Sequence, residues 1–112
     1  MTEVTLRQVQ QRVDDWIKSV GVRYFSELTN LAQLVEEVGE LARLMSRRFG
    51  DQSSKPDEPA AELDEELADI LFVLVCIANQ SGIDLNSAFE QTMEKKTRRD
   101  GQRHRTNAKL CP

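Results

Sequence analysis

Every residue from Ile70 to Ala78 is apolar, and this run constrains the fold more than any other. It lies in a helical pattern that begins near Pro59 or Ala60 and continues to about Gln80, before Gly82. A helix that is apolar all round must be buried on every side, in a bundle centre or in a subunit interface. A chain of 112 residues can hardly cover such a helix alone. We therefore expect a small helical domain that associates with copies of itself.

Apolar residues at helical spacing predict three further helices. Their expected ranges are 5–20, about 30–49 and 85 to about 98. Candidate N-caps are Thr5, Ser26 or Thr29, and Asp84. The segment from Gly50 to Pro59 is rich in Gly, Ser, Pro and Asp, and it predicts a loop that lets two helices fold back antiparallel.

The pattern also predicts which side chains form the core. In the second helix these are Leu31, Leu34, Val35, Val38, Leu41, Ala42 and Met45. In the fourth they are Leu85, Ala88, Phe89 and Met93. The expected fold is all-α, an antiparallel four-helix bundle formed by one domain over residues 1–103, with 104–112 as a mobile tail.

Two pairs of carboxylates share a spacing of three residues. Glu37 and Glu40 lie in the second expected helix, and Glu66 and Asp69 lie in the third. This spacing places each pair on neighbouring turns, close enough to share one hard cation, and two antiparallel helices can bring both pairs to one point. The sequence thus offers a metal centre with oxygen ligands.

For either pair alone, solvated glutamates are the common alternative. Two observations favour a site. Glu66 and Asp69 continue the buried stripe, where unpaired carboxylates cost several kcal/mol unless a cation compensates. Gly39 sits inside a helix at a cost of about 1 kcal/mol, which suggests close approach of another backbone or a ligand. With no Cys or His nearby, Mg²⁺ or Mn²⁺ is favoured over zinc.

The charge is unevenly distributed. The formal net charge of −4 argues against a nucleic-acid polymer as partner. Basic residues nevertheless gather toward the C-terminus at Lys95, Lys96, Arg98, Arg99, Arg103, Arg105 and Lys109. A solvated helix end explains them without any ligand. An acidic centre beside a cationic segment also suits a metal together with a polyanion.

Three features of the sequence bear on the cellular location. Cys76 and Cys111 imply no disulfide framework. The first ten residues, MTEVTLRQVQ, lack the apolar core of a signal peptide, and no apolar run is long enough to span a bilayer. We expect a cytoplasmic protein without a membrane partner.

Three runs carry a family resemblance: LVEEVGELARLMSRRFG, EELADILFVLVCIAN and MEKKTRRD. They closely resemble the MazG-like members of the all-α nucleoside triphosphate pyrophosphohydrolases, from about Tyr24 to about Arg103, and in particular the short single-domain members. EExxE followed by ExxD at this separation is a specific combination. The resemblance implies a dimer-based assembly, often tetrameric, that hydrolyses a nucleoside triphosphate to the monophosphate and pyrophosphate with Mg²⁺.

The resemblance also implies roles for individual residues. The implied metal ligands are Glu37, Glu40, Glu66 and Asp69. Glu36 matches an acidic residue near the attacking water, so Glu36 and Glu37 are the candidate catalytic residues. No Ser-His or Cys-His nucleophile is apparent, and direct attack by water is the simpler route.

The candidate substrate-binding residues lie at the two ends of the chain. Lys95 and Arg99 match basic residues that meet the phosphates, and Asp100 stands where the family has Asn or Asp. Trp16 and Phe25 are expected in the core, although one of them could stack on the base. Lys96 departs from the family, which commonly has an aromatic or aliphatic residue there.

The sequence leaves alternatives to a nucleotide pyrophosphohydrolase that cleans the nucleotide pool. One is a non-catalytic helical interaction module whose acidic face meets a basic partner. Another is a metal-dependent hydrolase of a different phosphate ester.

Overall fold

The computed structural model describes residues 3–56 and 62–111. In these ranges the regular structure is entirely helical: α1 (Leu6–Ser19), α2 (Glu27–Phe49), α3 (Leu63–Gln80) and α4 (Leu85–Asp100). The all-α prediction is therefore confirmed. The expected start of the third helix, near Pro59 or Ala60, lies outside the described residues.

Local signals at the helix ends explain where the helices begin. Thr5 forms a capping box with Gln8 at the start of α1. Ser26, rather than Thr29, caps α2, and this helix consequently begins earlier than expected. Asp84 caps α4 through its side chain, as predicted.

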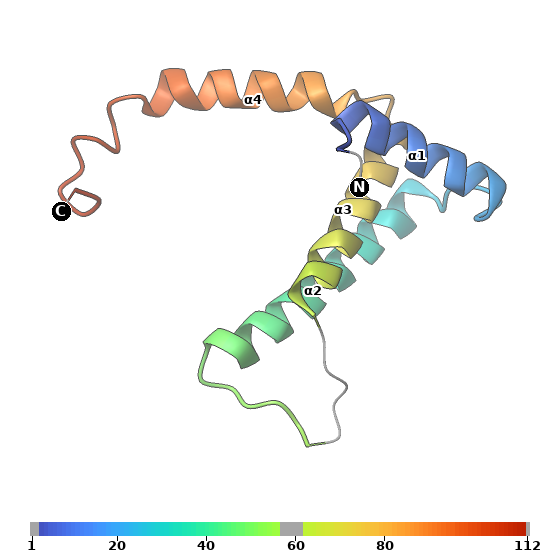
Figure 1. Ribbon diagram of the computed structural model, residues 1–112, viewed down its shortest axis with the longest axis horizontal. Helices are drawn as coiled ribbons and strands as arrows, with labels where there is room; N and C mark the ends of the chain where they lie inside the picture. The colour runs from blue at the N-terminus through green and yellow to red at the C-terminus, as the bar shows by residue number, and fades with distance from the viewer. Residues whose placement is uncertain (1–2, 57–61, 112) are drawn as a thin grey trace.

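The helices do not close into a four-helix bundle within one chain. Figure 1 shows α2 and α3 side by side and antiparallel, α1 across the far end of α3, and α4 extending away from the pair. The axes of α3 and α4 meet at 104°. The radius of gyration is 18.0 Å, whereas a compact chain of about 100 residues has one near 13 Å. The single chain is therefore more open than a closed bundle, and a bundle completed by assembly stays a prediction.

The composition of α4 explains why it leaves the helix pair. This helix has few apolar residues, so packing it along α2 and α3 would bury little apolar surface. Leu85 and Ala88, at its beginning, are half-buried, but Phe89 and Met93 are exposed. The prediction that all four side chains face a core holds only for the first two.

The core of the single chain is small. Among the described residues, its buried apolar members are Ile17, Val73, Val75, Cys76 and Ala78, of which Val75 is fully buried. The apolar run of α3 is thus covered on one side only, because Leu71, Phe72 and Leu74 remain exposed.

In α2 the predicted core stripe is divided between two faces. Half-buried positions recur at Leu34, Glu37, Leu41 and Leu44, a spacing of three and four residues that defines the face toward α3. The other predicted core positions are exposed, and these are Leu31, Val35, Val38, Ala42 and Met45. The buried face of α2 is therefore centred on a different side of the helix from the one that the apolar pattern predicts.

Gly39 lies near the exposed face of α2. A Cβ atom built there meets nothing within 4 Å, apart from the helix's own backbone and its chain neighbours. The close approach predicted at this glycine is not made by the described part of the chain itself.

Beyond Gly101 the chain forms successive turns, such as the one closed by the hydrogen bond from the Arg103 amide to the Asp100 carbonyl. The mobility of residues 104–112 and the domain limits remain predictions. No single described helix is long and apolar enough to cross a membrane, and only the bent pair of α3 and α4 passes that test of length and composition.

Candidate metal and nucleotide site

Three carboxylates from α2 and α3 converge on one point. Glu37, Glu66 and Asp69 each offer an oxygen, and these oxygens lie within 4.8 Å of one another. Glu37 belongs to the half-buried face of α2, while Glu66 and Asp69 lie on neighbouring turns of α3. The antiparallel packing of two helices thus brings together groups that are far apart in the sequence.

The electrostatics of this cluster favour a cation. Burial is the main effect that raises the pKa of Glu37, and the negative charges of Asp69, Glu66, Glu40 and Glu36 raise it further. The fully ionised cluster is therefore unfavourable without a positive charge. Hard cations such as Mg²⁺ or Mn²⁺ take carboxylate oxygens, so the donor set fits the metal that the sequence predicts.

Glu36 and Glu40 are exposed and lie outside the group of three. Both are nevertheless close enough to act on the pKa of Glu37. Glu40 follows Glu37 by one helical turn, within reach of a cation on the same side of α2. Their roles as ligand and as catalytic carboxylate stay predictions.

The predicted phosphate-binding residues are not brought to the carboxylates of the same chain. Lys95 and Arg99 are exposed on α4, which points away from the α2–α3 pair (Figure 1). Lys95 and Arg98 border a hollow of about 440 Å³ along this helix. A shared substrate would require α4 of another copy or a different direction of α4.

Asp100 links two arginines at the end of α4. Its Oδ2 accepts hydrogen bonds from Nε and Nη2 of Arg99, at 3.0 and 2.7 Å. Its Oδ1 accepts one from Nη1 of Arg103, at 3.2 Å. Arg99 first and Arg103 second hold the pKa of Asp100 at about 2. The carboxylate consequently fixes the direction of the Arg99 guanidinium, a role that sequence reasoning missed.

The two candidate aromatic residues lie near the start of the chain. Trp16 packs edge-on against Phe72, with ring centroids 5.6 Å apart, and keeps 47% of its surface exposed. Phe25 is 58% exposed. The core-packing alternative therefore applies in part to Trp16 and not to Phe25, and both rings retain a surface on which a base could stack.

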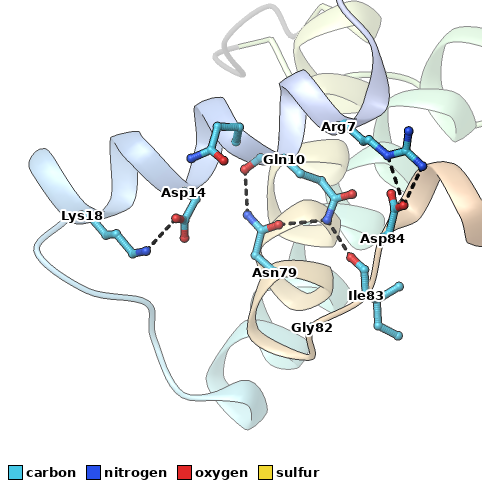
Figure 2. A pocket seen from close by; sticks show the side chains of 9 residues that line it. Arg7, Gln10, Asp14, Lys18, Asn79, Gly82, Ile83 and Asp84 are labelled. Atoms are coloured by element: carbon cyan, nitrogen blue, oxygen red, sulfur yellow. Dashed lines mark hydrogen bonds and ion pairs between the residues drawn. The ribbon is translucent and has the colours of Figure 1, made fainter.

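A polar network between α1 and the α3–α4 turn was not predicted. A pocket of about 450 Å³ lies between them. In this pocket Gln10 bonds to Asn79 and Ile83, while Arg7 pairs with Asp84 (Figure 2). In the sequence Gln10 and Asn79 are ordinary polar positions, because nothing local reveals partners so far along the chain. The network therefore becomes visible only in three dimensions.

The sequence of this chain matches the model of the MazG nucleotide pyrophosphohydrolase domain over residues 25–104. The chain belongs to this family. YpjD of Bacillus subtilis is 41% identical over 103 residues, which is 92% of this chain and 93% of YpjD. Bovine dCTP pyrophosphatase 1 is 36% identical over 103 residues, which is 88% of this chain and 60% of the bovine protein.

Two solved structures have the same fold as this chain. The crystal structure of YpjD from Bacillus subtilis has a TM-score of 0.74 at 41% identity and covers 85% of this chain and 97% of that one. A Bacillus-conserved MazG protein, described as a nucleotide pyrophosphohydrolase, has a TM-score of 0.71 at 38% identity, with coverages of 85% and 91%. This chain is therefore a MazG-family enzyme, a hydrolase that acts on nucleoside triphosphates.

Proposed function

We propose that this MazG protein is a Mg²⁺-dependent pyrophosphohydrolase that converts a nucleoside or deoxynucleoside triphosphate to the monophosphate and pyrophosphate. One observation carries the proposal: oxygens of Glu37, Glu66 and Asp69, from two helices, lie within 4.8 Å of one another. Three carboxylates leave other positions of a Mg²⁺ ion available for water and phosphate oxygens, as in sites that share the metal with their substrate.

The metal and the protein have separate tasks. A divalent cation supplies charge neutralisation at the phosphate oxygens and a more acidic water. Glu36, exposed beside the cluster, orients the attacking water or accepts its proton. Lys95 and Arg99 bind phosphate oxygens, and Asp100 holds the Arg99 guanidinium in one direction.

A homo-oligomer, dimer or tetramer, completes the site. The exposed apolar side chains of α2 and α3 support this association, since a stable monomer rarely leaves such a large apolar face uncovered. In the assembly, α4 of one copy brings Lys95 and Arg99 toward the carboxylates of another. The apolar run of α3 is then buried on both sides, as its composition requires.

The substrate panel should begin with dCTP, because relatives in cattle and humans are named dCTP pyrophosphatase 1. This chain spans about 60% of the length of those relatives, so the choice of base remains a proposal. Trp16 and Phe25, both with exposed rings, are candidates to stack on the base. We also propose a cytoplasmic location and a role in cleaning the nucleotide pool, with neither a membrane nor a nucleic-acid polymer as partner.

A panel of normal and damaged nucleoside triphosphates, with Mg²⁺, with Mn²⁺ and without metal, tests the proposal. We expect one monophosphate and one pyrophosphate per triphosphate consumed, and only with metal. The Asp69→Asn protein, purified in the same way, controls for contaminating hydrolases. Release of orthophosphate instead of pyrophosphate, or metal-independent turnover, would contradict the proposal.

An interaction module with an acidic face is the rival interpretation of the exposed carboxylates. Such a module would bind a basic partner equally well with and without metal. Hydrolysis of another phosphate ester, but of no triphosphate in the panel, would favour the remaining alternative.

A further inference from the structure

The turn between α3 and α4 decides where α4 points. It is short, and Gly82 adopts φ +67°, a left-handed conformation that favours glycine. The amide of Ile83 donates to the Ala78 carbonyl at 2.9 Å, which closes the end of α3. The packing of α4 on the rest of the chain is mainly with α1. The direction of α4 must therefore be set at this turn and by α1.

Gln10 of α1 contacts both sides of the turn (Figure 2). Its Nε2 donates to Oδ1 of Asn79, at 3.0 Å, and to the Ile83 carbonyl, at 2.8 Å. Its Oε1 accepts from the amide of Leu85, the first residue of α4, at 2.8 Å. One half-buried carboxamide thus joins the last turn of α3, the connection and the first turn of α4.

Asn79 continues the network from α3. Its Nδ2 donates to the backbone carbonyl of Gln10 and to Oη of Tyr24, each at 3.0 Å. The Tyr24 hydroxyl in turn donates to Oδ1 of Asp14, at 2.6 Å. Burial, with the hydrogen bond to Asp14, raises the pKa of Tyr24 to about 12, so the hydroxyl keeps the proton that it donates. Both amide side chains are therefore held in one orientation.

We propose that Gln10 and Asn79 are positioning residues: their hydrogen bonds fix the direction of α4 relative to α3 and, through it, the location of Lys95 and Arg99. This role rests on the proposed function, in which those two cations bind the phosphates. A small rotation at the turn produces a large displacement along α4, because the helix extends freely beyond α1 (Figure 1).

The nearby ion pair between Arg7 and Asp84 contributes less to fixing the direction of α4. Both side chains are exposed, and exposed pairs contribute little because water and salt screen them. Gln10 and Asn79 are half-buried, and removing one partner leaves the other amide with unmade hydrogen bonds.

The direction of α4 can be measured without any nucleotide. Spin labels at Asp64→Cys on α3 and Gln91→Cys on α4, in a Cys111→Ser chain diluted with unlabelled protein, report one distance distribution within a chain. We expect Gln10→Ala and Asn79→Asp to broaden or shift it. Gln11→Ala is the matched control, because Gln11 lies on the same helix and its side-chain amide donates to Oδ1 of Asp15, at 2.9 Å, within α1. Circular dichroism checks that the variants keep their helices.

Kinetics then separate positioning from simple structural damage. Gln10→Ala should raise KM about 5- to 20-fold, as expected from losing a few hydrogen bonds, with kcat nearly unchanged and Mn²⁺ affinity in the absence of nucleotide unaffected. The proposal would be overturned if the distances stayed unchanged in both variants. It would also be overturned if the distances changed but KM did not, or if Gln11→Ala had the same effects. If no triphosphate is hydrolysed by the wild-type protein, the proposed function fails, whereas the distances still decide whether Gln10 and Asn79 direct α4.

Discussion

Glu37 of α2 and Asp69 of α3 place carboxylate oxygens within 4.8 Å of each other, and Glu66 adds a third within the same limit. Among the neighbouring charges, that of Asp69 has the largest effect in raising the pKa of Glu37. Two such groups repel each other unless a cation lies between them, so this proximity is costly in a protein that binds none.

Removing a ligand's charge while keeping its shape should therefore abolish most activity. We expect Asp69→Asn or Glu40→Gln to lower turnover at least about 100-fold and to weaken metal binding, because affinity depends on ligand charge. Mg²⁺ should raise the melting temperature of the wild type more than that of either variant. Glu65→Gln, beside the cluster but not in it, is the control. Near wild-type turnover of Asp69→Asn at ordinary Mg²⁺ concentrations would remove Asp69 from the site.

The exposed face of α2 should be a subunit interface. We expect light scattering at micromolar concentration to give a dimer or tetramer of the 12.8 kDa chain. Val35→Glu, at a side chain that is 64% exposed in the single chain, should shift the mass toward the monomer, because a charge cannot be buried there without a partner. Val4→Glu, an exposed valine away from α2, should leave the mass unchanged. A monodisperse wild-type monomer would refute the interface.

Val22, between α1 and α2, should be a site of backbone strain. It has φ +73°, and its side chain is 81% exposed. A β-branched residue in the left-handed region costs roughly 1–2 kcal/mol, and the exposed side chain recovers little of this cost by packing. Val22→Gly should therefore raise the melting temperature by a few degrees, whereas Val20→Gly, which has φ −102° at the end of α1, should lower it. A lower melting temperature for Val22→Gly would show that the valine side chain matters more than the strain.

Sequence reasoning succeeded where the signals are local. The N-cap of α1 is Thr5 as predicted, because a side chain bonding to the next turn is encoded within a few residues. Glu37, Glu66 and Asp69 of the predicted ligand set lie together, as helical spacing and an antiparallel hairpin favour, while Glu40 lies outside this group; their role as metal ligands stays a prediction.

It failed where distant partners decide the outcome. In α2 both faces carry apolar residues, so the pattern could not tell Leu34, which faces α3, from Val35, which faces outward. The direction of α4 depends on hydrogen bonds from Gln10 to residues late in the chain, which no helical period encodes. The open arrangement of the single chain was not expected for the same reason.

The titration of the Asp100 carboxyl group should depend on its arginine partners. Its pKa is lowered from an ordinary 3.8 to about 2, first by Arg99. A carboxyl whose pKa is lower in the folded state stabilises that state above its ordinary pKa, and this contribution is lost as pH falls from about 4 to about 2. Carboxyl NMR titration should show the pKa rising in Arg99→Ala and staying low in Arg105→Ala. An unchanged pKa in Arg99→Ala would contradict the ion pair.

Arg99 is also the residue that best separates phosphate binding from metal binding. We expect Arg99→Ala to lower kcat/KM by roughly 10- to 100-fold, which corresponds to losing about 1.5–3 kcal/mol of charge-assisted hydrogen bonding. The affinity for metal without nucleotide should remain nearly unchanged, because Arg99 lies on α4 and the carboxylates lie on α2 and α3.

Arg105→Ala is the matched control for Arg99→Ala, since it removes the same charge from the turns that follow α4. A long-range attraction of the triphosphate would weaken similarly in both variants and would disappear in about 0.3 M salt, where the screening length is only several Å. A direct contact of Arg99 with phosphate, held in direction by Asp100, should instead persist in that salt and should distinguish the two variants. If both substitutions behaved alike and salt abolished both effects, Arg99 would contribute only to a general positive field around α4.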